Sequence, residues 1–245
     1  MKEVTIKARN GTNCIVYGVL NTPSRKKDKV IVFVHGLTGH KNEHQFYNAA
    51  GFFTKRGFAT LRFDLYSGEK KGRTLSAATL TDHYNDLNSI IEFAKKKYKK
   101  VYLVGHSLGG PTIAGANNKE AEAVVLWDPS LNLRKKFSKG KELRWNKKLH
   151  KYMLKWGTEY ILSREMVIQW DEETKSSIML EKIKKPTKII CAGKGKLWKE
   201  WKKHIKKIQA PHQLVVIKNA GHCFDEVNTE ERLFQETQKW LKKFS

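Results

Sequence analysis

The sequence contains few cysteines, few acidic residues and no long apolar run. Its three cysteines, Cys14, Cys191 and Cys223, are widely spaced and form no CxxC pair. This spacing argues against disulfides and zinc ligation and predicts reduced, mostly buried thiols. No segment approaches the roughly 18 consecutive apolar residues of a membrane-spanning helix, and residues 1–11 lack the apolar core of a secretory signal. We therefore expect a soluble cytoplasmic protein.

The shortage of acidic residues leaves the chain strongly basic, with 48 Lys+Arg against 24 Asp+Glu and a formal net charge of +24. A surplus of this kind is typical of proteins that bind nucleic acid or another anionic partner. The lysines are scattered, however, and no nucleic-acid-binding motif accompanies them. After residue 196 four apolar residues recur at helical spacing: Leu197, Trp201, Ile205 and Ile208. Lysines take most of the other positions of this segment. We favour solvated faces of amphipathic helices, which leaves a nucleic-acid partner open as the less favoured alternative.

The apolar content is sufficient for one large core. Hydrophobic residues make up 40% of the 245 positions and aromatic residues 11%. A chain of this length commonly forms a single α/β domain. We therefore expect one domain over residues 1–245.

Strand and helix patterns alternate along most of the chain. Residues 4–8 and 14–20 flank Asn10-Gly11 and predict an N-terminal β-hairpin. The later strands are short and continuously apolar, as in a sheet buried on both faces. The alternation predicts a mostly parallel, doubly wound sheet with right-handed crossovers. Strands are expected at 29–34, 58–64, 100–104, 122–127, 187–192 and 213–217, and helices at 43–56, 81–97, from about 109, 197–208 and 226–243.

The alternation stops between about 130 and 185. Within this segment five apolar residues form one stripe at helical spacing: Trp145, Leu149, Tyr152, Met153 and Trp156. Lysines lie opposite the stripe, and Gly157 follows it as a helix stop signal. We therefore predict a small helical insertion.

The strongest chemical signal is VYLVGHSLGG at residues 101–110, a GxSxG motif between an apolar strand and a segment able to start a helix. A tight turn at the strand end holds the serine in a strained conformation, and side chains at the two flanking positions would collide across it. The following helix start favours developing negative charge. We favour Ser107 as a nucleophile over an ordinary glycine-rich turn.

Two further segments follow the chain order of serine hydrolases. The sequence His-Gly-Leu at residues 35–37 ends a strand, where the N–H of Leu37 is a candidate oxyanion-hole donor together with the N–H of Leu108. His222 follows the last predicted strand, at the same edge of the sheet as Ser107. An imidazole there can accept the serine proton.

With these motifs the chain resembles an α/β-hydrolase, and more narrowly the serine esterases related to feruloyl/cinnamoyl esterases and the monoacylglycerol-lipase-like hydrolases. The resemblance implies ester hydrolysis through an acyl-serine intermediate without a cofactor. It also implies that the insertion corresponds to the family's variable cap, and that Asp64 is structural. The motifs that carry it are HGLTGHKNE at 35–43, RFDLYSG at 62–68, GHSLGG at 105–110 and NAGHCF at 219–224.

The chain departs from this family where the triad acid is usual. The strand at 187–192 normally leads into Gly-x-x-Asp, but here Gly-Lys-Gly-Lys occupies 193–196. Lys196 cannot orient His222 or stabilise its protonated ring, because an ammonium group beside the ring disfavours protonation.

Asp128 is the substitute that we favour. It follows the predicted strand at 122–127, one strand beyond the nucleophile, and preserves the order Ser107, acid, His222. The alternative is an Asp-Pro turn that merely starts the insertion. Glu200 and Asp225 are weaker candidates, because Glu200 lies in a predicted helix and Asp225 is better placed to cap the last helix.

These residues predict a carboxylic-ester hydrolase that acts on a small-molecule ester. The aromatic residues of the insertion would cover the acyl pocket and favour an aromatic or medium-chain acyl group. One alternative keeps the enzyme and lets Lys194, Lys196 and Lys199, near the predicted edge of the site, attract acidic substrates. The rival hypothesis is a non-catalytic protein of the same fold that binds an anionic partner. The natural substrate and the oligomeric state stay open.

Overall fold

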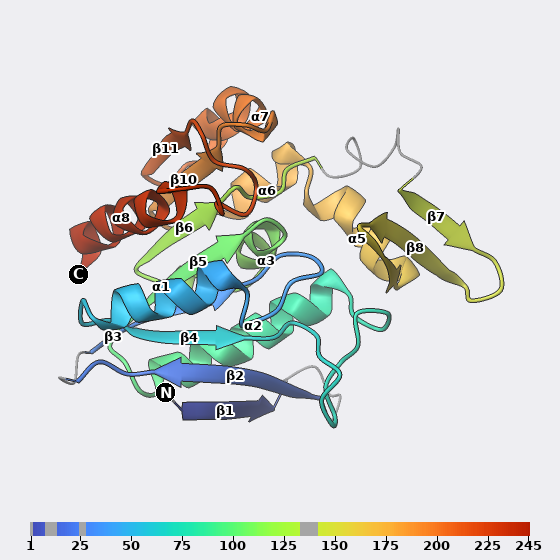
Figure 1. Ribbon diagram of the computed structural model, residues 1–245, viewed down its shortest axis with the longest axis horizontal. Coiled ribbons are helices and arrows are strands. Elements are labelled where there is room, and N and C mark those ends of the chain that lie inside the picture. Colours follow the sequence, from blue (N-terminus) through green and yellow to red (C-terminus); the bar gives the residue numbers. More distant parts are fainter. Residues whose placement is uncertain (1, 8–13, 25–27, 133–141) are drawn as a thin grey trace.

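The computed structural model describes residues 2–7, 14–24, 28–132 and 142–245. Its main element is an eight-stranded sheet, which runs through the centre of the molecule (Figure 1). The strands lie in the spatial order β1 (Lys2–Lys7), β2 (Ile15–Asn21), β4 (Ala59–Phe63), β3 (Lys29–Val34), β5 (Lys100–His106), β6 (Ala123–Trp127), β10 (Thr187–Ala192) and β11 (His212–Ile217).

Antiparallel pairing is confined to the N-terminal end of this sheet. β1 and β2 form the predicted hairpin, in a register that runs from Lys2 opposite Leu20 to Lys7 opposite Ile15, and β2 pairs antiparallel with β4. All the other neighbours in the sheet are parallel. The mostly parallel sheet with an N-terminal hairpin is therefore confirmed, while the predicted Asn10-Gly11 turn lies outside the described residues.

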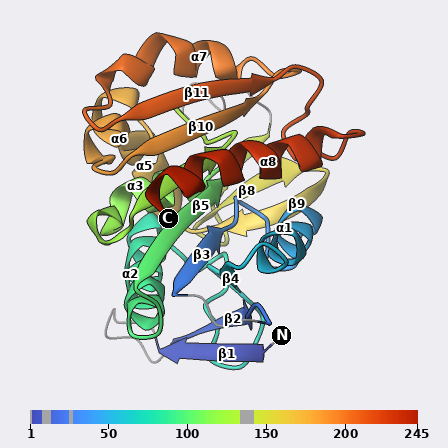
Figure 2. The same ribbon diagram turned by 90° about the vertical axis from the view of Figure 1, so that its left-hand side faces the viewer.

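Helices cover both faces of the sheet (Figure 2). Alternate residues of each parallel strand point to opposite faces, so Val30 and Val32 join one apolar core and Ile31 and Phe33 the other. The first core is covered by α2 (Leu80–Lys95), α3 (Gly109–Gly115), α6 (Ser176–Lys182) and α7 (Leu197–His204). The second is covered by α1 (His44–Thr54) and α8 (Thr229–Leu241). Short 3₁₀ turns occur at η1 (Asn118–Glu120), η2 (Ile205–Lys207) and η3 (Lys242–Phe244).

The lysine-rich segment after residue 196 is amphipathic, as predicted. Trp201 is fully buried, and Ile205 and Ile208 are nearly so. The lysines of α7 and η2 are exposed. Burial of the apolar stripe thus fixes this helix against the sheet and leaves a basic outer face.

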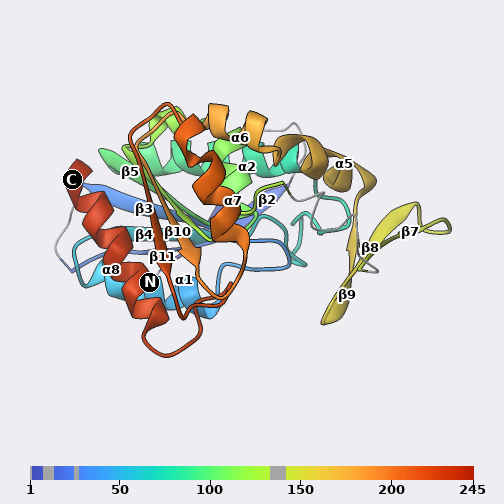
Figure 3. The ribbon, with the colours of Figure 1, turned by 90° about the horizontal axis from the view of Figure 1, so that it is seen from above.

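The insertion is only partly helical. It contains α5 (Arg164–Glu173) and α6, but the helix predicted over the aromatic stripe is wrong. That segment forms a three-stranded antiparallel sheet of β7 (Leu143–Asn146), β8 (Lys151–Trp156) and β9 (Thr158–Leu162). Figures 1 and 3 place this small sheet at one end of the molecule, beside α5.

Cross-strand pairing explains why the stripe forms strands. Trp145 of β7 lies opposite Tyr152 of β8, with ring centroids 5.0 Å apart, and aromatic pairs stabilise neighbouring strands. Gly157 has a φ of 73° and separates Trp156 from its pairing partner Thr158. The glycine therefore makes a hairpin turn between β8 and β9 and does not end a helix.

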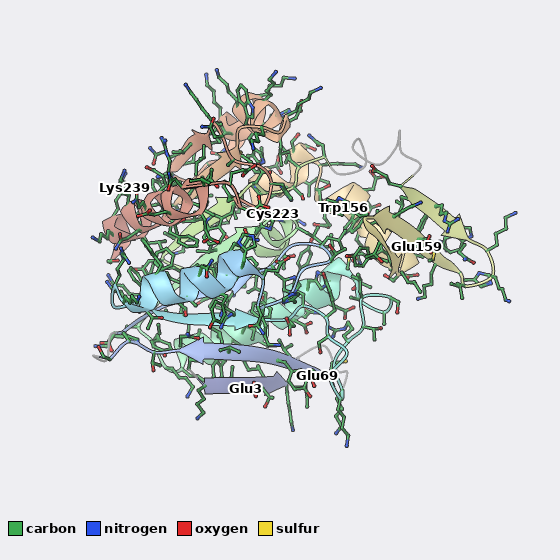
Figure 4. The ribbon with its side chains drawn as sticks, viewed as in Figure 1. Glu3, Glu69, Trp156, Glu159, Cys223 and Lys239 are labelled. Atoms are coloured by element: carbon green, nitrogen blue, oxygen red, sulfur yellow. The ribbon has the colours of Figure 1, made fainter. Side chains whose placement is uncertain are left out.

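The three cysteines are free, but the prediction that they are mostly buried is wrong for two of them. Cys191 is buried in β10, Cys14 is half-buried and Cys223 is exposed. Cys223 lies in the loop between β11 and α8 (Figure 4). Within the described ranges, no helix combines the length and the apolar character needed to cross a membrane.

Candidate active site

Ser107 lies in a strained turn between β5 and α3. Its φ is 51°, a left-handed value that is uncommon for residues other than glycine. A Cβ on Gly105 would lie 2.6 Å from the carbonyl oxygen of Gly109, and a Cβ on Gly109 would lie 2.2 Å from that of Val34. Both glycines are therefore required by close backbone approach, and the turn presents the serine at the carboxyl edge of the sheet.

Asp128 occupies the corresponding position after β6. It has a φ of 38°, and only 4% of the residue is exposed. Its Oδ2 accepts a hydrogen bond from Nδ1–H of His222 at 2.6 Å, and its Oδ1 accepts one from the backbone N–H of Ala192 at 3.0 Å. Both carboxylate oxygens are thus engaged, which fixes the orientation of the acid and, through it, of the imidazole.

Backbone hydrogen bonds join the turn around Ser107 (the serine turn) to the loop that begins at Asp128 after β6 (the acid loop). The N–H of Ser107 donates to the carbonyl of Trp127, and the N–H of Ser130 donates to the carbonyl of Ser107, both at 3.0 Å. The hydroxyls of Ser107 and Ser130 lie 3.3 Å apart. Trp201 of α7 donates from Nε1 to the carbonyl of Pro129 at 2.8 Å. The buried side chain of Trp201 therefore ties α7 to the acid loop.

His222 is held by a second histidine that sequence reasoning missed. His106 donates from Nε2 to the carbonyl of His222 at 2.8 Å, and the two ring centroids lie 4.7 Å apart. Gln45 of α1 donates to Nδ1 of His106 at 3.0 Å. These bonds require a neutral His106 ring, in keeping with burial, which lowers the pKa of His106 well below its usual value. The GxSxG motif offers no signal for this contact, because its second position is not specified.

The loop at residues 35–37 approaches the serine turn closely. A Cβ on Gly36 would lie 3.0 Å from Cβ of Ser107. His35 donates from Nδ1 to the carbonyl of Gly36 at 2.8 Å and accepts at Nε2 from the N–H of Leu65 at 2.9 Å. Burial lowers the pKa of His35 to about 4, which keeps this ring neutral as both bonds require. The loop that carries Leu37 is therefore anchored to the turn after β4.

Leu37 and Leu108 share one apolar cluster with the insertion. Leu108 immediately precedes α3, so its N–H lies at the start of that helix. Leu37 is partly buried against the same cluster. The insertion contributes aliphatic and aromatic side chains to it: Leu154, Leu162, Met166 and Trp170, with Tyr152, Tyr160 and Val167 packed at its edge. Trp145 and Trp156 are exposed in contrast, and Figure 4 shows Trp156 on the small sheet.

Of the other two acid candidates, Glu200 pairs with residues of its own helix and Asp225 is exposed. Glu200 lies in α7, 3.4 Å from Nζ of Lys203 and 3.8 Å from Nε2 of His204. Asp225 is exposed and does not cap α8, since Asn228 directly precedes that helix. The prediction that Asp225 caps the last helix is wrong, because α8 begins at Thr229, later than predicted.

Two further residues of the sequence motifs have clear positions. Lys196 is exposed and directly precedes α7. Asp64 is buried and accepts a hydrogen bond from the backbone N–H of Lys41 at 2.7 Å, which ties the loop before α1 to the end of β4.

Solved structures with the same fold match over nearly the whole chain. Est1E from Butyrivibrio proteoclasticus, with ferulic acid bound, has a TM-score of 0.80 at 19% identity, covering 98% of this chain and 99% of its own. Alpha/beta hydrolase domain-containing protein 10 from mouse has a TM-score of 0.78 at 17% identity, with both chains fully covered. The esterase Pf2001 from Pyrococcus furiosus has a TM-score of 0.69 at 19% identity, covering 99% and 92%. At these identities the likeness establishes the fold.

The family of the chain follows from its sequence. No curated protein matches it significantly. The family described as serine aminopeptidase, S33, matches residues 25–223, a range that includes the serine turn, the acid loop and His222. Together with the sheet order and the strained serine turn, this match shows that the chain belongs to the S33 family of α/β-hydrolases.

Proposed function

We propose that the protein is a carboxylic-ester hydrolase with Ser107 as nucleophile, His222 as general base and Asp128 as the triad acid. The observation that carries this proposal is the 2.6 Å hydrogen bond between Nδ1 of His222 and the buried carboxylate of Asp128. That bond leaves Nε2 of His222 as the nitrogen that accepts a proton. The strained turn at Ser107 supplies the hydroxyl at the same edge of the sheet.

The reaction proceeds by acyl transfer to the serine. Oγ of Ser107 attacks the ester carbonyl while Nε2 of His222 takes its proton, and the N–H groups of Leu37 and Leu108 stabilise the oxyanion. The imidazolium then protonates the departing alcohol, which leaves an acyl-serine. Water attacks this ester with His222 again as base, and the carboxylic acid departs. Asp128 stays ionised and stabilises the imidazolium throughout.

The apolar cluster beside Leu37 and Leu108 supports an apolar acyl group. Its insertion side chains, Leu154, Leu162 and Met166, are fully buried. We propose that the insertion acts as the cap of the acyl pocket and favours an aromatic or medium-chain acyl group. Ferulic acid bound to Est1E is an aromatic carboxylic acid of this kind.

Labelling by a fluorophosphonate probe tests the nucleophile, together with hydrolysis of p-nitrophenyl acetate, butyrate and octanoate. We expect the wild type to be labelled and to hydrolyse the esters, and Ser107→Ala to lose both properties. Ser130→Ala is the matched control, because it removes the neighbouring hydroxyl and leaves the nucleophile.

Several outcomes would contradict the proposal. Retention of both properties in Ser107→Ala would exclude this serine as the nucleophile. Turnover of an aminoacyl p-nitroanilide without ester turnover would assign amide hydrolysis instead. A wild type inert to the probe that binds nucleic acid with a steep salt dependence would support an anion-binding protein, the function suggested by the charge of +24.

A further inference from the structure

Glu226 lies in the loop between His222 and α8 and uses both carboxylate oxygens. Its Oε2 accepts a hydrogen bond from the backbone N–H of Gly221 at 2.7 Å. Its Oε1 accepts one from Nζ of Lys194, also at 2.7 Å. The carboxylate therefore links the residue before His222 to the loop that follows β10.

The loop after β10 is itself fixed against the loop after β11. The N–H of Gly193 donates to the carbonyl of Ile217 at 2.9 Å, and the N–H of Lys194 donates to that of Ala220 at 3.0 Å. A Cβ on Gly193 would lie 2.4 Å from the carbonyl oxygen of Lys218, so the two backbones are in close contact. Lys194 thus holds the histidine loop through its backbone and, by way of Glu226, through its side chain.

The exposure of this ion pair argues that it contributes little to global stability. The side chains of Lys194 and Glu226 are 57% and 28% exposed, and ion pairs in such surroundings are screened by solvent. The Gly221 N–H and, next, Lys194 lower the pKa of Glu226 to about 2. Glu226 is therefore ionised throughout the neutral range, and its two contacts persist there.

The bond between Gly221 and Glu226 matters for the site because Gly221 directly precedes His222. The next residue, His222, must keep Nδ1 within 2.6 Å of Asp128. On its other side the carbonyl of His222 accepts a hydrogen bond from His106. The backbone around His222 is thus held on both sides, by Glu226 through Gly221 and by His106.

We propose that Glu226, paired with Lys194, is a positioning residue that holds the loop of His222 in the geometry needed for proton transfer. This inference rests on the proposed ester hydrolase function. It assigns a role to the first lysine of the basic segment at 193–196, the segment in which the usual acid is missing. Lys194 does not replace that acid but helps to position the histidine that the acid would contact.

The experiment measures kcat and KM for p-nitrophenyl butyrate separately, with the melting temperature of each variant. In Glu226→Ala we expect kcat to fall about 10–100-fold, by analogy with the loss seen when hydrogen-bond partners that orient metal-binding side chains are removed, with KM within about two-fold. Glu226→Gln should recover most of kcat, because its amide oxygen still accepts from Gly221. Lys194→Met should lose no more of kcat than Glu226→Gln, because the carboxylate of Glu226 still accepts from Gly221. Melting temperatures should change little.

Glu231→Ala and Lys202→Met serve as matched controls, because both residues are exposed and lie on α8 and α7. We expect both to keep wild-type kcat. Amide exchange at Gly221, followed by NMR, should be faster in Glu226→Ala and unchanged in the controls. This readout reports the loop contact without requiring turnover.

Three results would overturn the inference while leaving the proposed function in place. A Glu226→Ala enzyme with wild-type kcat would show that the loop holds its geometry without the carboxylate. Equal losses in Glu226→Ala and Glu226→Gln, with lower melting temperatures, would indicate a general structural role. Unchanged exchange at Gly221 would exclude the contact. A wild type without ester turnover or probe labelling would instead overturn the proposed function, and this inference with it.

Discussion

The loops after β6 and β10 follow neighbouring parallel strands yet carry opposite chemistry. The first presents Asp128, a buried carboxylate with both oxygens bonded. The second, residues 193–196, presents exposed lysines, and its backbone is bonded to the loop that carries His222. Adjacent carboxyl-end loops are close enough that either can carry an acid that reaches the histidine. The contact with His222 is the reason that we propose Asp128, one loop earlier than the usual family pattern, as the triad acid.

The largest expected effect comes from removing the acid of the first loop. Asp128→Asn should lower kcat for p-nitrophenyl butyrate about 10⁴-fold, the loss seen when a serine-protease triad acid is made an amide. The amide no longer stabilises the charged imidazolium and can impose the wrong tautomer. Steady-state kinetics of the purified variant measure this loss.

Glu200→Gln and Asp225→Asn are the controls for this prediction, since Glu200 contacts Lys203 and His204 and Asp225 is exposed. Both should keep turnover close to that of the wild type. A loss of several orders of magnitude in Glu200→Gln, with a mild effect of Asp128→Asn, would transfer the role to α7.

The second loop should respond to a change in its backbone packing. Gly193→Ala places a Cβ against the backbone of Lys218 at 2.4 Å, and overpacking of this kind costs about 1–3 kcal/mol. A Cβ on Gly195 meets only one atom, at 4.0 Å, so Gly195→Ala should be neutral or slightly stabilising. Urea unfolding measures both changes. Equal stabilities of the two variants would mean that the loop is not packed as described.

The smallest expected effect concerns the ionisation of Glu226. NMR titration should find its carboxyl group with a pKa of about 2, against the usual 4.5. At this partly exposed site the depressed pKa adds only a small, solvent-screened contribution to stability, which is fully present above the unfolded value and is lost as the pH falls through the folded one. Lys194→Met removes a cation and should raise the pKa, so that this contribution is lost at a higher pH. An unchanged titration in Lys194→Met would show that the pair is not formed in solution.

Local patterns were sufficient to predict the sheet and the order of the candidate site residues. Continuous apolar strands and the GxSxG turn are both visible in short stretches of consecutive residues. These stretches were therefore enough to predict β3 to β6 and the position of Ser107 at a strand end. The small sheet of the insertion was mispredicted, because in a short aromatic segment helical and strand spacing coincide. The pairing of Trp145 with Tyr152 decided between them.

Contacts between distant segments could not be predicted. His106 and His222 are 116 positions apart, and Lys194 and Glu226 are 32 apart. No local pattern marks these pairs, because a contact between distant segments depends on where the fold places both of them. Asp128 could be suggested only because the chain order of serine hydrolases limits where an acid can lie.

The proton between His222 and Asp128 tests the central claim most directly. A low-field proton NMR resonance from Nδ1–H of His222 should be present in the wild type and in Glu200→Gln. It should disappear in Asp128→Asn, which replaces the charged carboxylate acceptor with an amide, and in His222→Gln, which removes the donor. A resonance that persists in Asp128→Asn and disappears in Glu200→Gln would contradict the assignment of Asp128 as the triad acid.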